Sequence, residues 1–272
     1  MKRILNVLIL ILLGSGVIFL FVFANTMQSD IKCSSFEIDI DYNGAPPLIN
    51  KSTIKRQITQ SGIRIKDQPV AGIPVQKLQK LLNSNPYVKK AIISVSVNGI
   101  VKASIHQRNP LVRVMDKENN EYLLDTEGYI MPVNYDFPVR LVFANGNISN
   151  IKTVKAPTKN NGDIQRVNLH KPVEKNRIVL PSDLGYIHKT AIAVNSDSLT
   201  SALVEQIYIN EKKEIELIPK IGNQSVVLGD TTQLSEKLNN LKVFYQQGIK
   251  NFAWNNYKVI NLKYKNQVVC SK

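Results

Sequence analysis

The stretch ISVSVNGIVKASI, residues 93–105, decides the register of the N-terminal part of this 272-residue chain. Apolar residues alternate with polar ones in both of its halves, which is the period of two that a half-buried strand shows. A two-residue turn would place Val95 opposite Lys102 and mismatch the two faces of the hairpin. A three-residue loop ending at Gly99 pairs Val95 with Val101 instead, and puts the glycine where left-handed backbone is needed. The sequence therefore predicts a hairpin in this register.

Upstream of the hairpin, the sequence predicts one strand and two helices. Residues 36–40 alternate apolar and acidic side chains, as an amphipathic strand does. Asn50 can cap a short helix, and Pro74 is a favourable first residue for a second one. Residues 35–106 thus follow the order strand, helix, helix, strand, strand.

Further upstream, residues 4–23 are a run without charge, most of it Leu, Ile, Val or Phe. Twenty helical residues at about 1.5 Å each cover roughly 30 Å, the thickness of the hydrocarbon core of a bilayer. We expect a transmembrane helix over residues 4–24, with residues 1–3 as a cytoplasmic tail and the bulk of the chain exported. The alternative is a cleavable signal peptide with Ala24 at its cleavage site, although the apolar core of such peptides is shorter, about 7–15 residues.

The net charge of +14 bears on the partners of the chain. An exported chain does not meet nucleic acid, and no nucleic-acid-binding motif occurs, so we expect no nucleic-acid partner. The charge instead indicates a basic surface beside an anionic membrane or polymer. Cys33 and Cys270 could form a disulfide in an oxidising compartment, but two unpaired thiols are favoured, because pairing would bring the last strand back to the membrane surface.

No motif for catalysis or metal binding is present in the sequence. The three histidines, His106, His170 and His188, are scattered. The carboxylates of Glu37, Asp39 and Asp41 form a stripe, which a solvated strand face explains better than a cation site. We therefore expect a protein that is not an enzyme and has no cofactor, no metal and no small-molecule substrate.

Beyond the hairpin, the sequence predicts a β-rich antiparallel domain with flanking helices over residues 109–272. Its patterns predict strands at residues 122–125, 206–210, 214–219, 225–228 and 257–264, and a helix at residues 182–194. A final helix is capped by Asp230 and closed by Gly248. Residues 144–172 are rich in Asn, Lys and Gly and predict a polar insertion.

Several short segments, none specific alone, occur in an order that resembles the FtsQ family of cell-division proteins, called DivIB in Gram-positive bacteria. They are Asn85-Pro86-Tyr87-Val88, Gln107-Arg108-Asn109-Pro110, Leu124-Asp125-Thr126-Glu127-Gly128, and residues 215–219 and 257–268. The order of elements over residues 35–108 matches a POTRA domain, two helices packed on a three-stranded sheet. The expected architecture is α+β: one N-terminal transmembrane helix, one POTRA domain, and the β-rich domain.

The resemblance implies a non-catalytic divisome scaffold in the inner membrane at the division septum, with its bulk in the periplasm. It implies FtsB and FtsL as partners, and FtsB bound through the last strands of the β-rich domain. Strand addition at an open sheet edge is the physical basis for such binding. The candidate partner-binding residues are Trp254, Tyr257, Lys258, Val259, Ile260, Asn261, Leu262, Lys263 and Tyr264.

Two alternatives accompany this hypothesis. Ile260 and Leu262 could complete the hydrophobic core rather than bind a partner. POTRA domains also occur in transport and assembly modules of the periplasm, although such chains need a longer run of amphipathic strands than this one has. A proline at Val259 or Asn261 is expected to abolish partner binding, because proline removes a ladder donor.

Overall fold

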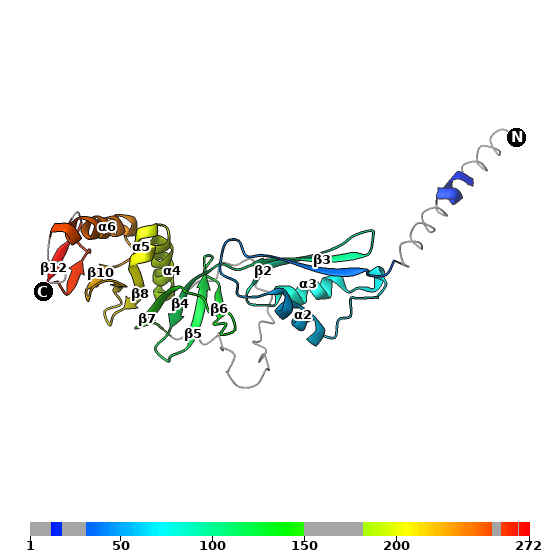
Figure 1. Cartoon of the computed structure of the whole chain (residues 1–272), viewed down its shortest axis with the longest axis horizontal. Helices are drawn as coiled ribbons and strands as arrows, with labels where there is room; N and C mark the ends of the chain where they lie inside the picture. Colours follow the sequence, from blue (N-terminus) through cyan, green and yellow to red (C-terminus); the bar gives the residue numbers. More distant parts are fainter. Residues whose placement is uncertain (1–11, 18–30, 150–181, 252–256, 266) are drawn as a thin grey trace. The chain divides into compact units, whose positions relative to one another are not determined.

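The computed structural model describes residues 12–17, 31–149, 182–251, 257–265 and 267–272. The chain forms two compact units. The first runs to Asn43 and resumes over Ile49–Gln107, and the second consists of Gly44–Leu48 and Arg108–Lys272. Each unit has its own sheet and its own hydrophobic core (Figure 1).

The predicted transmembrane segment lies for the most part outside the described residues. Residues 12–17 of it are helical. In the part of the chain that the structure describes, no helix has both the length and the apolar character needed to cross a bilayer.

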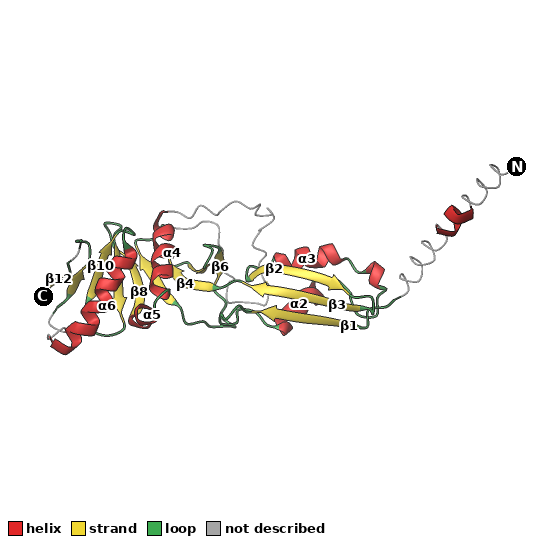
Figure 2. Ribbon diagram, turned by 90° about the horizontal axis from the view of Figure 1, so that it is seen from above, coloured by secondary structure: helices red, strands yellow, loops and turns green. Residues whose placement is uncertain are grey.

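The first unit is a three-stranded sheet with two helices packed against it (Figure 2). Strand β3 is central, parallel to β1 and antiparallel to β2. The core of this unit is built from inward-facing strand residues and from Ile54, Ile58, Leu78 and Leu82 of the helices. The elements are β1 (Ser35–Asp41), α2 (Lys51–Gln60), the 3-10 turn η1 (Val70–Gly72), α3 (Val75–Asn83), β2 (Val88–Val95) and β3 (Ile100–Gln107).

The predicted hairpin register and the Asn50 cap are confirmed, whereas Pro74 is the N-cap residue before α3 and not its first helical residue. Val95 pairs with Val101 in the hairpin, and Gly99 has φ +82°. A Cβ at Gly99 would lie 2.5 Å from the carbonyl oxygen of Lys32, so the hairpin tip packs closely on the chain just before β1. Asn50 caps α2 by accepting a 2.9 Å hydrogen bond from the Thr53 N–H.

The second unit is a nine-stranded sheet in the order β12-β11-β10-β9-β8-β7-β4-β5-β6. Helices α4, α5 and α6 all pack into one core on one face of this sheet (Figure 2). The elements are β4 (Pro110–Met115), β5 (Glu121–Asp125), β6 (Ile130–Pro132), β7 (Val142–Gly146), α4 (Ser182–Asn195), α5 (Ser198–Leu203), β8 (Val204–Ile209), β9 (Ile215–Pro219), β10 (Ser225–Gly229), α6 (Leu234–Asn251), β11 (Val259–Asn261) and β12 (Val269–Ser271).

The sheet is mixed, so the prediction of an antiparallel domain is wrong in part. Strand β7 runs parallel to both of its neighbours, β4 and β8, and β10 runs parallel to β11. The predicted insertion over residues 144–172 also begins too early. Ala144 belongs to β7, and both Ala144 and Ile148 are fully buried. Residues 150–181 lie outside the described part.

The predicted limits of the last helix are wrong as well. Helix α6 begins at Leu234, four residues after Asp230, and it continues past Gly248 to Asn251. Gln233 has a positive φ of 51°, so helical backbone starts only after it. The Asp230 carboxylate instead accepts hydrogen bonds from the Thr232 N–H (3.1 Å) and from the Lys237 ammonium (2.8 Å).

Candidate functional site: the C-terminal edge of the nine-stranded sheet

Strand β11, which was predicted to form the open edge, has a neighbour on each side. It runs parallel to β10, with Ile260 opposite Val226. It runs antiparallel to β12, with Ile260 opposite Cys270. The prediction that residues 257–264 present a free edge is therefore wrong, because the chain turns back after β11 and adds β12 to its exposed side.

The predicted partner-binding residues divide into three groups. Ile260 and Leu262 are 1% and 2% exposed and complete the core, as the alternative held. Lys258, Lys263 and Tyr264 are exposed. Tyr257, Val259 and Asn261 are half-buried, and Trp254 lies outside the described residues.

Lys263 extends from the end of β11 toward β9. Its ammonium lies 2.9 Å from a Glu214 carboxylate oxygen. The hydrogen bond between them is the main cause that raises the pKa of Lys263 and lowers the pKa of Glu214. A Cβ at Gly229 would lie 2.7 Å from Cδ of Lys263, so the lysine stem lies directly over that glycine. Lys263 thus fixes the end of β11 to the sheet.

Backbone hydrogen bonds define which way the peptide groups of β11 point. The Ser225 N–H donates to the Lys258 carbonyl, and the Leu262 N–H donates to the Val227 carbonyl, both at 2.9 Å. These groups face β10. Because peptide groups alternate in direction along a strand, those of Val259 and Asn261 face β12.

The same alternation identifies the open group of β12. Ser271 and Val269 are the Cα partners of Val259 and Asn261, so their peptide groups face β11. The Ser271 carbonyl also accepts a 2.8 Å hydrogen bond from the Lys258 N–H. Cys270 lies between them and directs its N–H and C=O to the outer side, where no strand pairs with β12 in the described part of the chain. We call this side of β12 the C-terminal edge.

The side chains of β12 alternate between two environments. Cys270 is partly buried against the core beneath the helices, and this burial raises the pKa of its thiol. Val269 (42% exposed) and Ser271 point to the opposite face. An added strand would therefore meet a core-facing surface and an open surface at alternate positions.

The open face carries side chains in register from strand to strand, half-buried on β8 to β11 and exposed on β12. One row runs through Tyr208, Glu216, Val227, Asn261 and Val269 of β8 to β12. None of the described helices packs on this face. The row ends at the C-terminal edge, so a strand added there would extend a surface that alternates polar and apolar groups.

A buried lysine holds the C-terminal end of β10. Lys237 is 7% exposed, and its ammonium donates to the carbonyls of Leu228 (2.8 Å) and Asp230 (3.1 Å) as well as to the Asp230 carboxylate. The hydrogen bond from Lys237 is the largest cause that lowers the pKa of Asp230 to about 2. This cluster ties α6 to the strand that supports β11 and β12.

The structure pairs His106 and two of the acidic residues of the predicted stripe with side chains on neighbouring strands. His106 lies 3.0 Å from Asp41, and Lys102 lies 3.2 Å from Asp39, so two carboxylates of the predicted stripe pair across the sheet. No group of three or more potential metal ligands occurs among the described residues. Cys33 and Cys270 are free thiols in different units.

Sequence reasoning missed β12 as the outermost strand. The available signal was the apolar pair Val268-Val269 after a polar turn, which predicts a further short strand. A single sequence does not show on which side of β11 that strand pairs.

Comparison with known families agrees with this architecture. Residues 109–271 match the family described as FtsQ/DivIB, C-terminal related, and residues 31–106 match the POTRA-like domain. No curated protein matches the chain. The C-terminal match covers more than half of the sequence and includes the whole edge described above. The chain therefore belongs to the FtsQ/DivIB family, whose members are generally non-catalytic scaffolds of cell division.

Proposed function

We propose that this protein is a membrane-anchored division scaffold that binds FtsB and FtsL by accepting a strand at the C-terminal edge. The outward-directed peptide group of Cys270, inside the family-matched domain, is the observation that carries the proposal. The role fits a protein that links early and late division proteins at the septum. It moves the binding strand from residues 257–264 to β12.

Strand addition explains why an edge is useful for this purpose. The N–H and C=O of Cys270 gain partners from the added strand, and each such bond contributes about 0.5–1.5 kcal/mol net. A strand as short as β12 offers few of these bonds, so side chains must supply most of the affinity. Val269 and the half-exposed Tyr264 are the exposed large apolar side chains closest in sequence to the edge, and exposed aromatics are frequent interface anchors.

The proposed anchor is the apolar run at residues 4–24. It would hold the protein as a single-pass protein of the inner membrane, with its N-terminus in the cytoplasm and both units in the periplasm. The length and composition of the run and the family of the chain support this topology.

A fluorescent fusion of the full chain tests the proposal in dividing cells. We expect the fusion at midcell, and FtsB and FtsL at midcell with it. In cells that carry Cys270→Pro, the fusion should still collect there while the two partners disperse, because proline lacks the outward N–H.

The matched control is Cys270→Ala, which removes the thiol and keeps the N–H. If both variants retained the partners at midcell, the strand-addition proposal would be wrong. Recovery of the protein in outer-membrane fractions would contradict the anchor and favour a transport or assembly role.

A further inference from the structure

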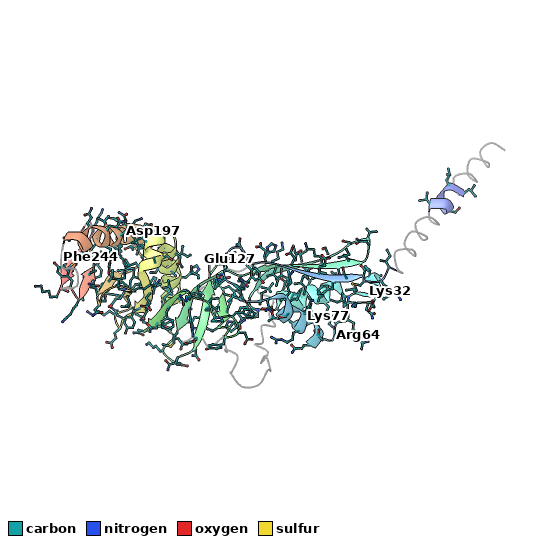
Figure 3. The ribbon with its side chains drawn as sticks, viewed as in Figure 1. Lys32, Arg64, Lys77, Glu127, Asp197 and Phe244 are labelled. Carbon is teal, nitrogen blue, oxygen red and sulfur yellow. The ribbon has the colours of Figure 1, made fainter. Side chains whose placement is uncertain are left out.

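Positively charged side chains cluster at the end of the first unit where the chain enters it, at residue 31. Five cations lie on it or beside it, and all are exposed: Lys32, Arg64, Lys66, Lys77 and Lys80. Figure 3 shows Lys32 at this end, and Arg64 and Lys77 on the side of the unit that carries the helices. None of the five forms an ion pair within the described part of the chain, and Asp67 is the one carboxylate among residues 64–80.

Two turns with exposed apolar groups flank the entering chain at the same end, one carrying Pro69, Ala71 and Pro74 and the other carrying Val97. On one side, the Val70 N–H donates to the Ile31 carbonyl and the Cys33 N–H donates to the Gln68 carbonyl, both at 2.8 Å. These bonds hold the uncharged loop of residues 69–75 against the entering segment.

On the other side, the hairpin tip packs on the same segment. The Ser34 N–H donates to the Gly99 carbonyl at 3.0 Å. Val97 at this tip is 77% exposed, the most exposed large apolar side chain of the described residues. Next to the loop, an open hollow is lined by Ile73, Pro74, Val75, Gln76, Lys77 and Lys80.

We infer that this end of the first unit, the basic tip, docks on anionic phospholipid headgroups. The exposed side chain of Val97 and the exposed Pro69, Ala71 and Pro74, with lysine and arginine nearby, suit a bilayer interface, where apolar groups enter the headgroup boundary and cations remain with the phosphates. An acidic protein partner would match the positive charge, but it would not explain the exposed apolar side chain of Val97.

The proposed anchor places the basic tip within reach of the bilayer, and in this respect the inference rests on the proposed function. Seven residues separate Ala24 from Lys32, and an extended chain covers about 3.3–3.6 Å per residue, so the tip lies within about 30 Å of the anchor. Salt screens the attraction between the cations and the anionic headgroups beyond a Debye length of about 8 Å. Within that distance of the membrane, the attraction holds the first unit against the headgroups.

The test uses the full chain reconstituted in vesicles with brominated acyl chains, which quench a nearby tryptophan. Val97→Trp adds a reporter at the tip, and the unmodified chain with its single Trp254 supplies the baseline. We expect the added emission to be quenched in vesicles with about one third anionic lipid, and quenching to fall by at least about half in zwitterionic vesicles or at about 0.5 M salt.

Charge variants identify the surface. Neutralising the tip with Arg64→Gln, Lys66→Gln, Lys77→Gln and Lys80→Gln should remove the quenching. A matched control neutralises four exposed lysines elsewhere, Lys117→Gln, Lys212→Gln, Lys220→Gln and Lys272→Gln, and should keep it. Equal quenching in both lipids, or no quenching in a chain that floats with the vesicles, would overturn the inference.

Flotation separates this inference from the proposed anchor. A chain that floats only with anionic vesicles, and loses flotation in the tip variant, would support the basic tip and contradict the anchor. A chain that floats with neither lipid would contradict both.

Discussion

Gly146 is a residue at which no side chain fits. It ends β7 with φ +104°, and a Cβ there would lie 2.2 Å from the carbonyl oxygen and 2.9 Å from the nitrogen of Ile209. Ile209 belongs to β8, the neighbouring strand, so the clash falls on backbone that is itself held in the sheet. The glycine is therefore needed for the close approach as well as for the dihedral angle.

Gly146→Ala should lower the free energy of unfolding of the second unit by roughly 3 kcal/mol or more, because strain and clash add. Gly44→Ala is the control in the same unit. Gly44 also has a positive φ, but nothing lies within 4 Å of its Cβ position, so we expect a cost of about 1 kcal/mol. Amide hydrogen exchange of the second unit measures both, and equal costs would contradict the packing described for β7.

Lys237 makes stability depend on pH through Asp230. The folded pKa of Asp230, about 2, lies below the ordinary value of 3.8. A depressed carboxyl pKa gives stabilisation that is present above pH 3.8 and is lost as the pH falls through 2. Because the Asp230 side chain is 64% exposed, this ionic part amounts to no more than about 1 kcal/mol.

Lys237→Met should raise the pKa of Asp230 toward its ordinary value but leave it lowered by the hydrogen bonds from Thr232. The substitution should cost about 2 kcal/mol at pH 7 through the lost ionic part and the unpaired Leu228 carbonyl. The difference in stability between the parent and the variant should narrow between about pH 4 and pH 2. Carboxyl titration by NMR and denaturation across this range measure the two effects. A pH-independent difference would show that Lys237 acts without Asp230.

Two elements of the first unit are set by local signals that the sequence predicted well, whereas the local signals at Asp230 and Gly248 misplaced both ends of α6. The Asn50 cap and the register around Gly99 depend on residues a few positions apart, and both are confirmed. Strand β7 was missed because its neighbours β4 and β8 are remote in sequence and because Asn145 and Gly146 are poor strand formers. For the same reason, the place of β12 outside β11 could not be read from the pattern of Val269 and Cys270.

The order of β11 and β12 changes what proline should do. At Asn261 it would remove an N–H that faces β12 inside the sheet, so Asn261→Pro should destabilise the second unit by about 3 kcal/mol and expose β12 to exchange. At Cys270 it would remove the outward N–H, so Cys270→Pro should leave the protection of β10 and β11 close to that of the parent chain. Hydrogen exchange of the two variants measures this, and equal loss of protection would show that the edge is assigned to the wrong strand.

Over the whole molecule, the sequence predicted two folded parts behind an apolar run, and the structure describes two units with separate cores. The proposed topology of the apolar run rests on charge, since Lys2 and Arg3 precede it. An alkaline phosphatase fusion to Lys272 should be active, and a fluorescent protein at the N-terminus should remain cytoplasmic. Lys2→Glu with Arg3→Glu should reduce the phosphatase activity, and an inactive C-terminal fusion in the parent chain would contradict export.

The amide of Cys270 gives the most direct test of the account. In the full chain without partners, we expect it to exchange with solvent much faster than the amides of Val259 and Asn261, whose peptide groups face β12. On addition of FtsB and FtsL, the Cys270 amide should become protected, because the added strand accepts its hydrogen bond. A complex that forms while this amide exchanges as before would contradict strand addition at the C-terminal edge.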